Sequence, residues 1–251
     1  MTSASERPRA LVTGAAHRVG RAVALELARR GLDLVLTWNT SRAACESTAE
    51  DCRAIDPAAR VETVHLALED DEAVRALGDR LASEGLDAVV HNASRYRRTP
   101  FDSLDSEEVL LHFRINAMAP LVLTSRLAPA LRRSRLERGG AVVCLGDIHA
   151  MGRPRREHAG YLASKGALDR VVESLAVELA PEVRVNGVAP GVVAWAEDDL
   201  TPEQRVRYVE AIPLGREGTL EEAAETVAWL LLEAGYVNGT VVPLDGGRRL
   251  R

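Results

Sequence analysis

The side chains best suited to proton chemistry lie in the stretch Tyr161-Leu162-Ala163-Ser164-Lys165. Lys165 is the only lysine among the 32 Lys and Arg residues, which points to a task that a guanidinium cannot perform. Four residues apart, Tyr161 and Lys165 share one face of a helix. An ammonium near a phenol favours the phenolate, so we expect the pKa of Tyr161 to fall below its ordinary value of about 10 and the side chain to exchange protons at neutral pH. A chance Tyr and Lys on an amphipathic helix is the plain alternative.

The elements that must position these side chains follow from an alternation of short apolar runs and longer helical patterns. Near-continuous apolar runs between helices indicate a parallel sheet covered on both faces. We predict a single-domain, doubly wound α/β fold of the Rossmann type with about seven strands, whose ligands bind beyond the carboxyl ends of the strands. The predicted strands are Arg9–Thr13, Leu32–Thr37, Val61–Leu66, Asp87–His91, Gly140–Leu145, Arg184–Val188 and Val241–Leu244. The predicted helices are Arg18–Arg30, Ser41–Ala54, Asp70–Ser83, Ser106–Arg133, His158–Leu179, Pro202–Ala211 and Leu220–Glu233, with 1–8 as a flexible N-terminus and 192–213 as a substrate lid.

Composition limits the possible function classes. The 251 residues fit one large α/β domain, and 46% hydrophobic with 27% charged residues is ordinary for a soluble globular protein. A net charge of −5 without a basic stripe argues against a nucleic-acid partner. No apolar run approaches the roughly 20 residues that span a bilayer, and the polar N-terminus lacks the apolar core of a signal peptide. Cys45, Cys52 and Cys144 lack metal-ligand spacing, so we expect no metal site and a reduced, cytoplasmic protein.

The first strand-to-helix turn is rich in small residues and reads Thr13-Gly14-Ala15-Ala16-His17-Arg18-Val19-Gly20. Small side chains let the backbone approach a pyrophosphate, which then lies on the helix N-terminus. The turn therefore predicts a dinucleotide-binding site. Its candidate cofactor-binding residues are Gly14, His17, Arg18, Val19 and Gly20.

The stretch after the second strand reads Asn39-Thr40-Ser41-Arg42, where an NAD-binding protein carries an acid for the ribose 2′-hydroxyl. No carboxylate is present there to repel a 2′-phosphate. Asn39, Thr40 and Ser41 can donate hydrogen bonds to such a phosphate, and Arg18 and Arg42 can supply positive charge. We therefore predict NADP(H) rather than NAD(H) as the cofactor. Capping of the next helix by Ser41 is compatible with this role.

Taken together, these motifs resemble the short-chain dehydrogenase/reductase family, whose first turn reads Thr-Gly-x-x-x-Gly-x-Gly. Arg18 replaces the middle glycine, as in the pteridine reductase branch of that family. The resemblance extends from Arg9 to Leu250 and implies hydride transfer from a nicotinamide to a C=N or C=O group. Ala67 stands where relatives carry an Asp that clamps adenine, which leaves the backbone of Leu68 for that contact.

The segment after the fourth strand is the part of the chain most similar to pteridine reductases. It reads His91-Asn92-Ala93-Ser94, similar to Asn-Asn-Ala-Ser in that branch, and Tyr96 follows. The resemblance implies that Asn92 and Ala93 contact the cofactor, that Ser94 binds the substrate head group, and that Tyr96 stacks on a flat substrate ring. An ordinary loop aromatic is the alternative for Tyr96.

The loop after the sixth strand is similarly family-like at Pro190-Gly191. The resemblance implies that Pro190, Gly191 and the backbone of Val193 lie beside the nicotinamide. Trp195, within the predicted lid, is a candidate substrate contact.

Two further residues complete the predicted catalytic set. Asn116 matches the Asn of the family's catalytic tetrad, where it holds a water that links the lysine to solvent, and a buried, bonded helical Asn is the alternative. Most relatives carry a Ser thirteen residues before the Tyr, and pteridine reductases carry an Asp instead. Asp147 lies fourteen residues before Tyr161, as if one residue were inserted. This spacing leaves Ile148 as the other possible occupant. A carboxyl beside a phenol in a cleft can pass a proton, and His149 is a weaker candidate.

The sequence thus predicts an NADPH-dependent reductase of a pterin- or folate-like C=N substrate. One alternative is a carbonyl reductase acting on a ketone or 3-oxoacyl group, and another is a non-catalytic NADP-binding protein. The expected partner is a small-molecule substrate, with neither nucleic acid nor a membrane involved. The resemblance also implies a homotetramer assembled through 106–133 and 158–179.

Overall fold

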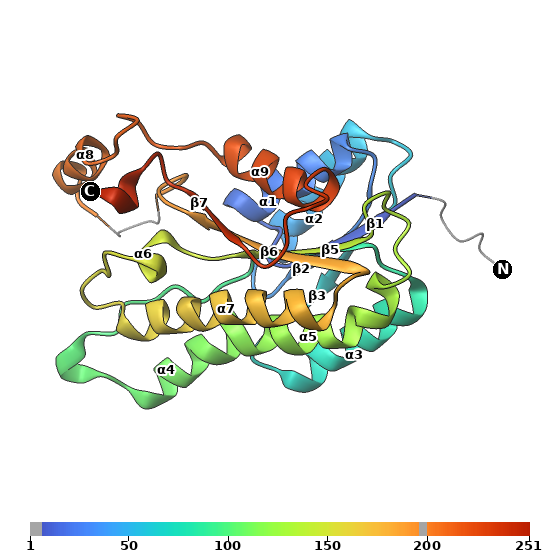
Figure 1. The fold of residues 1–251 in the computed structure, drawn as a ribbon, viewed down its shortest axis with the longest axis horizontal. Coiled ribbons are helices and arrows are strands. Elements are labelled where there is room, and N and C mark those ends of the chain that lie inside the picture. Colours follow the sequence, from blue (N-terminus) through green and yellow to red (C-terminus); the bar gives the residue numbers. More distant parts are fainter. Residues whose placement is uncertain (1–6, 196–199) are drawn as a thin grey trace.

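The structure, a computed structural model, describes residues 7–195 and 200–251. Within these residues, seven parallel strands form one sheet in the order β3-β2-β1-β4-β5-β6-β7, with helices on both faces (Figure 1). The predicted doubly wound α/β fold is confirmed. The strands are β1 (Arg9–Val12), β2 (Asp33–Trp38), β3 (Val61–His65), β4 (Ala88–His91), β5 (Gly140–Leu145), β6 (Val183–Pro190) and β7 (Val241–Leu244).

The helices fall into two layers and a small group at the carboxyl ends of the strands (Figure 1). One face of the sheet is covered by α1 (Arg18–Arg29), α2 (Arg42–Ile55) and α9 (Leu220–Leu232). The other face is covered by α3 (Asp71–Glu84), α4 (Ser106–Phe113), α5 (Ala119–Leu131) and α7 (Ala159–Glu178). The short α6 (Ile148–Met151) and α8 (Pro202–Glu210) lie at the end of the sheet that carries the C-terminus.

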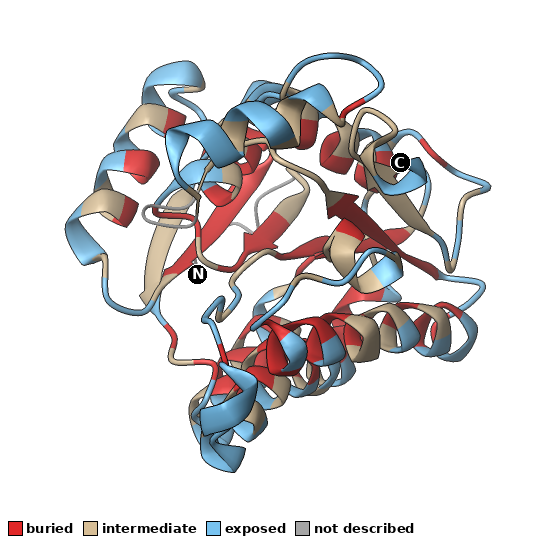
Figure 2. Cartoon of the chain, turned by 90° about the vertical axis from the view of Figure 1, so that its left-hand side faces the viewer, coloured by how far each residue is buried: buried red, intermediate tan, exposed pale blue. Residues whose placement is uncertain are grey.

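The core consists of two apolar layers separated by the sheet, which Figure 2 shows as buried strands between half-buried helices. Successive side chains of a strand point to opposite faces. Val143 of β5 accordingly packs in one layer with Leu27 of α1, whereas Val142 packs in the other with Leu127 of α5. Burial on both faces explains why the strands read as continuous apolar runs.

Helix starts differ in whether a side chain caps them. Thr219 caps α9 through a capping box, in which its hydroxyl accepts from the backbone N–H of Glu222 and the Glu222 carboxylate accepts from that of Thr219. In contrast, His17 and Ser41 begin α1 and α2 without a side-chain capping bond. The predicted cap by Ser41 is therefore wrong. The first backbone N–H groups of α1 and α2 remain available to a ligand.

The helix predicted over 106–133 is not continuous. α4 ends at Phe113, a π-helical turn covers Arg114–Met118, and α5 then continues from Ala119. The interruption therefore precedes Pro120, which is tolerated in the first turn of a helix because its missing N–H has no partner there. The π-helical turn contains Asn116, and such turns are frequent at functional sites.

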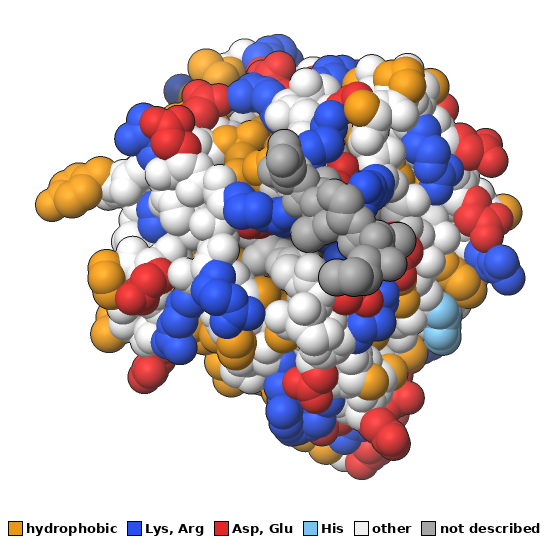
Figure 3. Space-filling model, turned by 90° about the vertical axis from the view of Figure 1, so that its right-hand side faces the viewer, with side chains coloured by type: hydrophobic (Ala, Val, Ile, Leu, Met, Phe, Trp, Pro, Cys, Tyr) orange, Lys and Arg blue, Asp and Glu red, His pale blue; other side chains and the backbone are white. Residues whose placement is uncertain are grey.

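Ion pairs and backbone bonds tie the chain at the amino ends of the strands. Arg7 forms ion pairs with Asp33 (3.4 Å) and Asp56, and the backbone N–H of Asp33 donates to the carbonyl of Pro8 (2.9 Å). The flexibility predicted for 1–8 stays a prediction, since these bonds concern residues 7 and 8 and 1–6 lie outside the described residues. Basic and acidic side chains are interspersed over this face of the molecule (Figure 3).

Across the described chain, no helix has the length and apolarity needed to cross a bilayer.

Candidate active site

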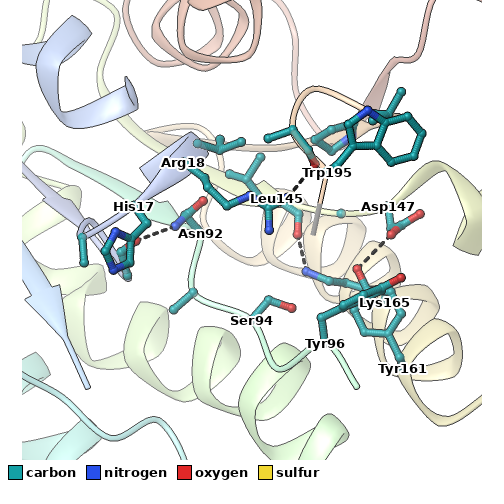
Figure 4. A pocket seen from close by; sticks show the side chains of 18 of the residues that line it. His17, Arg18, Asn92, Ser94, Tyr96, Leu145, Asp147, Tyr161, Lys165 and Trp195 are labelled. Carbon is teal, nitrogen blue, oxygen red and sulfur yellow. Dashed lines mark hydrogen bonds between the residues drawn. The ribbon is translucent and has the colours of Figure 1, made fainter. Parts of the chain in front are cut away.

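A cavity of about 520 Å³ opens where the carboxyl ends of the strands meet (Figure 4). It lies at the point where the strand order reverses between β1 and β4, which is the usual ligand site of doubly wound sheets. Most of the predicted site residues come together there. The predicted residues that line it are Gly14, His17, Arg18, Val19, Asn39, Thr40, Ser41, Asn92, Ala93, Ser94, Tyr96, Asp147, Tyr161, Lys165, Pro190, Gly191 and Trp195.

Four predicted residues lie behind this surface in the described structure. Gly20 packs against the carbonyl of Gly14, and Leu68 is buried in the core. Val193 faces Gly218, where an added Cβ would lie 3.0 Å from the Val193 Cγ1. Asn116 is buried beneath the segment after β4. The expected adenine contact at Leu68 and the nicotinamide contact at Val193 therefore remain predictions.

The turn between β1 and α1 fits a pyrophosphate. Gly14 has φ +65°, and a Cβ on it would lie 2.9 Å from the Ala93 Cβ. A Cβ on Gly20 would lie 2.2 Å from the Gly14 carbonyl oxygen and 2.4 Å from Asn92 Nδ2. The Asn92 amide holds the turn by donating to the carbonyls of Thr13 (3.0 Å) and Gly14 (2.9 Å). With α1 lacking a side-chain cap, the turn forms a backbone cradle for a phosphate group.

Arg18 adopts a conformation that favours glycine, with φ +50°. Its Nη2 donates to the carbonyl of Ala194 at 2.6 Å, in the loop after β6 (Figure 4). Arg18 thus links the phosphate-binding turn to the loop that follows β6. Its predicted contacts with cofactor and substrate remain predictions.

The part of the cavity beside β2 is lined by Trp38, Asn39, Thr40 and Ser41. Asp147, after β5, is the one carboxylate among the described residues that line the cavity. Arg42 lies next to this region, but its Nε donates to Glu46 at 2.7 Å. The residues present fit an uncharged or anionic ribose substituent.

Asp147 rather than Ile148 faces Tyr161. The Tyr161 hydroxyl donates to Asp147 Oδ2 at 2.8 Å, and Asp147 Oδ1 accepts from the backbone N–H of His149 at 2.7 Å (Figure 4). Asp147 is the N-cap of α6, which fixes its carboxylate, whereas Ile148 is fully buried beside Gly191. The start of α6 at Asp147 therefore determines that Asp147, and not Ile148, contacts the Tyr161 hydroxyl.

The expected lowering of the Tyr161 pKa is wrong. Burial, the negative charge of Asp147 and the hydrogen bond to Asp147 raise the pKa of Tyr161 well above its ordinary value. Lys165 Nζ donates to the carbonyl of Leu145 at 2.6 Å and lies 5.9 Å from the centre of the Tyr161 ring. The ammonium is therefore directed at a backbone oxygen while the carboxylate contacts the phenol, and Tyr161 holds its proton at neutral pH.

Lys165 is buried, and burial lowers its pKa to about 8. Its bond to Leu145, at the end of β5, anchors the ammonium beside the cavity floor. The side chain still lines the cavity with Tyr161, so the predicted Tyr and Lys pair does lie in the strand-end crevice.

Asn116 positions the segment after β4. Its Oδ1 accepts from Ser94 Oγ (3.1 Å) and Arg95 N (2.8 Å), and its Nδ2 donates to the Arg95 carbonyl (3.0 Å) and Ser164 Oγ (2.9 Å). These four bonds fill the capacity of the side-chain amide. A water held by Asn116 would therefore have to bond the backbone of that residue.

Tyr96 packs edge-on against Tyr161, with ring centres 4.8 Å apart, and its hydroxyl accepts from Arg155 Nη1 at 2.8 Å. Arg155 and Tyr208 also line the cavity, and neither was among the predicted site residues. No sequence motif marks them, because one lies in an irregular loop and the other on α8. His149, the weaker candidate, lines the cavity as well.

The remaining His and Cys side chains of the described residues give no metal-ligand group and no reactive thiol in the site. No group of three His, Cys, Asp or Glu side chains there could ligate a metal ion. The three cysteines are free and buried, and burial raises the pKa of Cys144 to about 12. His91, which replaces an Asn of the family pattern, is a core residue that bonds Thr124 at 2.8 Å, and burial lowers its pKa to about 3.

Comparison with known proteins defines the class of the chain. A family model described as enoyl-(acyl carrier protein) reductase matches residues 14–249. The uncharacterized oxidoreductase YmfI of Bacillus subtilis (strain 168) is 31% identical over 245 residues, which cover 95% of this chain and 97% of that protein. L-xylulose reductase of Bos taurus is 33% identical over 250 residues, covering 95% of each chain. The 3-oxoacyl-(acyl-carrier-protein) reductase FabG of Aquifex aeolicus (strain VF5) is 33% identical over 248 residues, covering 94% of this chain and 95% of that protein.

A solved structure agrees with these relatives. Acetoin dehydrogenase from Enterobacter cloacae matches with a TM-score of 0.84 and 29% identity, covering 97% of this chain and 96% of that one. The chain belongs to the short-chain dehydrogenase/reductase family, whose members are oxidoreductases that use a nicotinamide cofactor. These relatives give the predicted pteridine reductase branch no support.

Proposed function

We propose that the protein is an NADPH-dependent carbonyl reductase that converts a ketone or 3-oxoacyl group to an alcohol. The observation that carries the proposal is a buried, protonated Tyr161 whose hydroxyl is fixed by Asp147 in the same cavity as the phosphate-binding turn. L-xylulose reductase, a 3-oxoacyl reductase and acetoin dehydrogenase are named for carbonyl substrates or their alcohols, which supports this substrate class. The carbonyl reductase alternative is thus better supported than the pterin interpretation.

The preference for NADP(H) is part of the proposal. Asn39, Thr40 and Ser41 line the cavity after β2 and bring no carboxylate. The uncapped N-terminus of α2 adds backbone N–H donors and a partial positive charge beside them. A 2′-phosphate would gain from both features, whereas a 2′-hydroxyl would find no acid to accept its hydrogen bond.

In this mechanism the bound nicotinamide supplies the hydride, and the residues of the chain control the proton. Tyr161 holds a proton at Oη for the carbonyl oxygen. Its raised pKa keeps that proton in place until negative charge develops on the substrate oxygen. In this structure the single hydroxyl proton of Tyr161 is donated to Asp147, so that hydrogen bond must break and the hydroxyl must turn to the carbonyl oxygen when the substrate binds. The nearby ammonium of Lys165 stabilises the charge that develops on that oxygen. Acid catalysis of this kind contributes roughly 10²–10⁴-fold.

A pterin-like C=N compound is the second candidate substrate. It is favoured by one observation, that Ser94, Tyr96 and Asp147 line the same cavity as Tyr161. Tyr96 could pack against a flat heteroaromatic ring and gain about 0.5–1.5 kcal/mol beyond burial.

The test is a substrate panel followed through NADPH absorbance. Acetoin, L-xylulose, a 3-oxoacyl thioester and dihydrobiopterin are each offered with NADPH and with NADH. We expect turnover of at least one carbonyl compound and a higher kcat/KM with NADPH. Turnover of the pterin alone would select the second candidate, and equal kcat/KM with NADH would contradict the cofactor preference. Tight NADPH binding without any turnover would indicate a non-catalytic NADP-binding protein.

A further inference from the structure

The part of the cavity wall that α6 and α8 contribute contains a hydrogen-bonded pair, His149 and Tyr208. His149 Nδ1 lies 2.9 Å from the carbonyl oxygen of Arg153, and its Nε2 lies 3.2 Å from the Tyr208 hydroxyl. A carbonyl oxygen can only accept, so the Nδ1 of His149 carries the proton. Burial lowers the pKa of His149, which keeps the ring neutral with Nε2 as an acceptor.

This tautomer fixes the hydrogen of Tyr208. The hydroxyl of Tyr208 must donate to His149 Nε2, since a neutral imidazole has a single N–H. The Tyr208 oxygen is then left with lone pairs only. Toward any other group in the cavity it acts as an acceptor.

The ring of Tyr208 is held on several sides. The guanidinium of Arg248 lies 4.7 Å from the ring centre, and the rings of Trp195 and His149 pack edge-on at 5.4 Å and 6.1 Å. Trp195 is held in turn by a hydrogen bond from Nε1 to Glu217 at 2.7 Å. Fixed orientation reduces the entropy cost of a directional contact with a ligand.

The pair is connected to the catalytic centre through a short chain of bonds. The backbone N–H of His149 donates to Oδ1 of Asp147, and Oδ2 of the same carboxylate accepts from Tyr161. Tyr208, His149, Asp147 and Tyr161 all line one cavity. A substrate with its carbonyl oxygen at Tyr161 would therefore share this cavity with the Tyr208 hydroxyl.

We propose that Tyr208 and His149 form a hydrogen-bond-accepting subsite that selects carbonyl substrates with a hydroxyl group near the carbonyl. The inference deepens the proposed function and rests on it. A substrate hydroxyl donates to a lone pair of the Tyr208 oxygen, whereas a methylene at the same place displaces water from that half-buried oxygen and leaves the lone pair unpaired. Sites built to bond a hydroxyl reject the analogue that lacks it more strongly than apolar sites reject an added group.

The test compares two ketones with the same carbon skeleton, acetoin and 2-butanone, using NADPH and the full-length enzyme. We expect the wild-type kcat/KM to favour acetoin. Tyr208→Phe keeps the ring and its packing, and we expect it to reduce the acetoin to 2-butanone ratio about tenfold, the size of one hydrogen bond. Tyr236→Phe, at a fully exposed position, is the matched control and should leave the ratio unchanged. His149→Phe should reduce the ratio by less and add nothing to Tyr208→Phe.

A second measurement separates this inference from the proposed function. The affinities of both ketones are determined by calorimetry on enzyme saturated with NADP⁺. A preference for acetoin that Tyr208→Phe abolishes would support the subsite even if no ketone is reduced, in which case the proposed function fails alone. Equal binding and equal kcat/KM for the two ketones in the wild type would overturn the subsite and leave the carbonyl reductase proposal standing. A purely structural role for Tyr208 would lower stability without changing the ratio, which also overturns it.

Discussion

At the residue scale, the proton chemistry of Tyr161 is dominated by its burial and by the carboxylate of Asp147, which both raise its pKa. Asp147 contacts the hydroxyl directly, whereas the ammonium of Lys165 is bonded to a backbone carbonyl. A carboxylate beside a phenol disfavours the phenolate, and burial does the same. The arrangement therefore suits the donation of a proton in the reductive direction.

This view predicts the pH dependence of an Asp147→Asn variant. Removal of the negative charge lowers the pKa of Tyr161, because the carboxylate is one of the groups that raise it. Reduction needs protonated Tyr161, so activity is lost as the pH rises through that pKa. The decline of kcat at high pH should begin at a lower pH in Asp147→Asn than in the wild type. A profile of kcat against pH with NADPH measures this, and a decline that is unmoved or shifted to higher pH would contradict the assignment.

At this scale, the sequence was sufficient to identify most residues of the candidate site, but not which group each side chain contacts. The spacing of Tyr161 and Lys165 correctly put both in the cavity, since one helical turn separates them. Spacing alone could not show that the ammonium turns to Leu145, because that depends on where β5 ends. The uncertainty over Asp147 and Ile148 likewise depended on α6, a helix of a single turn with no detectable periodicity.

At the element scale, the turn between β1 and α1 must bring its backbone close to the cofactor. Gly20→Ala would put a Cβ 2.2 Å from the Gly14 carbonyl oxygen, so the turn would have to shift. We expect at least a tenfold loss of NADPH affinity, equivalent to about 1.4 kcal/mol. Fluorescence titration of NADPH measures it.

Gly166→Ala is the matched control for Gly20→Ala. Gly166 also lies in a helix, α7, but a Cβ there meets no atom within 4 Å. We expect unchanged NADPH affinity and a gain in stability of about 0.5–1 kcal/mol from higher helix propensity. Equal NADPH affinities for the two variants would show that the close approach at Gly20 has no role in binding.

The end of α9 depends on a buried arginine. Arg184 of β6 donates to the carbonyls of Leu230 (2.6 Å), Leu231 (2.8 Å) and Ala234 (3.0 Å), which satisfies the carboxyl end of the helix. Arg184→Leu leaves these oxygens buried and unpaired. We expect the free energy of unfolding to fall by at least about 1–3 kcal/mol, measured by urea denaturation.

The exposed Arg75, which forms an ion pair with Asp71 on α3, provides the comparison for Arg184. Arg75→Leu should change the free energy of unfolding by less than about 0.5 kcal/mol. Equal stability of Arg184→Leu and the wild type would show that the capping bonds are energetically neutral.

The elements themselves were largely predictable from sequence, with two kinds of exception. The inner strands largely follow from apolar runs, because both faces of the sheet are buried there, whereas the edge strands β3 and β7 are only partly buried. The π-helical turn at Arg114–Met118 was missed because its residues keep a helical pattern, and the change in bonding has no marker. Arg155 and Tyr208 were missed because their position in the cavity depends on how the loops and α8 fold over it.

At the scale of the whole molecule, assembly remains to be measured. We expect a homotetramer formed through 106–133 and 158–179, by analogy with the family that the sequence resembles. Leu110, Met118 and Leu121 are apolar and exposed on the α4 to α5 segment, which supports an interface there. Sedimentation velocity at several concentrations tests this expectation, and a species of 27.2 kDa throughout would contradict it.

The proposed carbonyl reductase activity requires that Tyr161 supply the proton to the substrate in the cavity that binds the dinucleotide. The most direct measurement is the steady-state reduction of the best ketone by Tyr161→Phe, with the exposed Tyr236→Phe as the control. We predict a loss of kcat of roughly 10²–10⁴-fold in Tyr161→Phe with an unchanged dissociation constant for NADPH, and wild-type rates in Tyr236→Phe. A wild-type kcat in Tyr161→Phe would contradict the account.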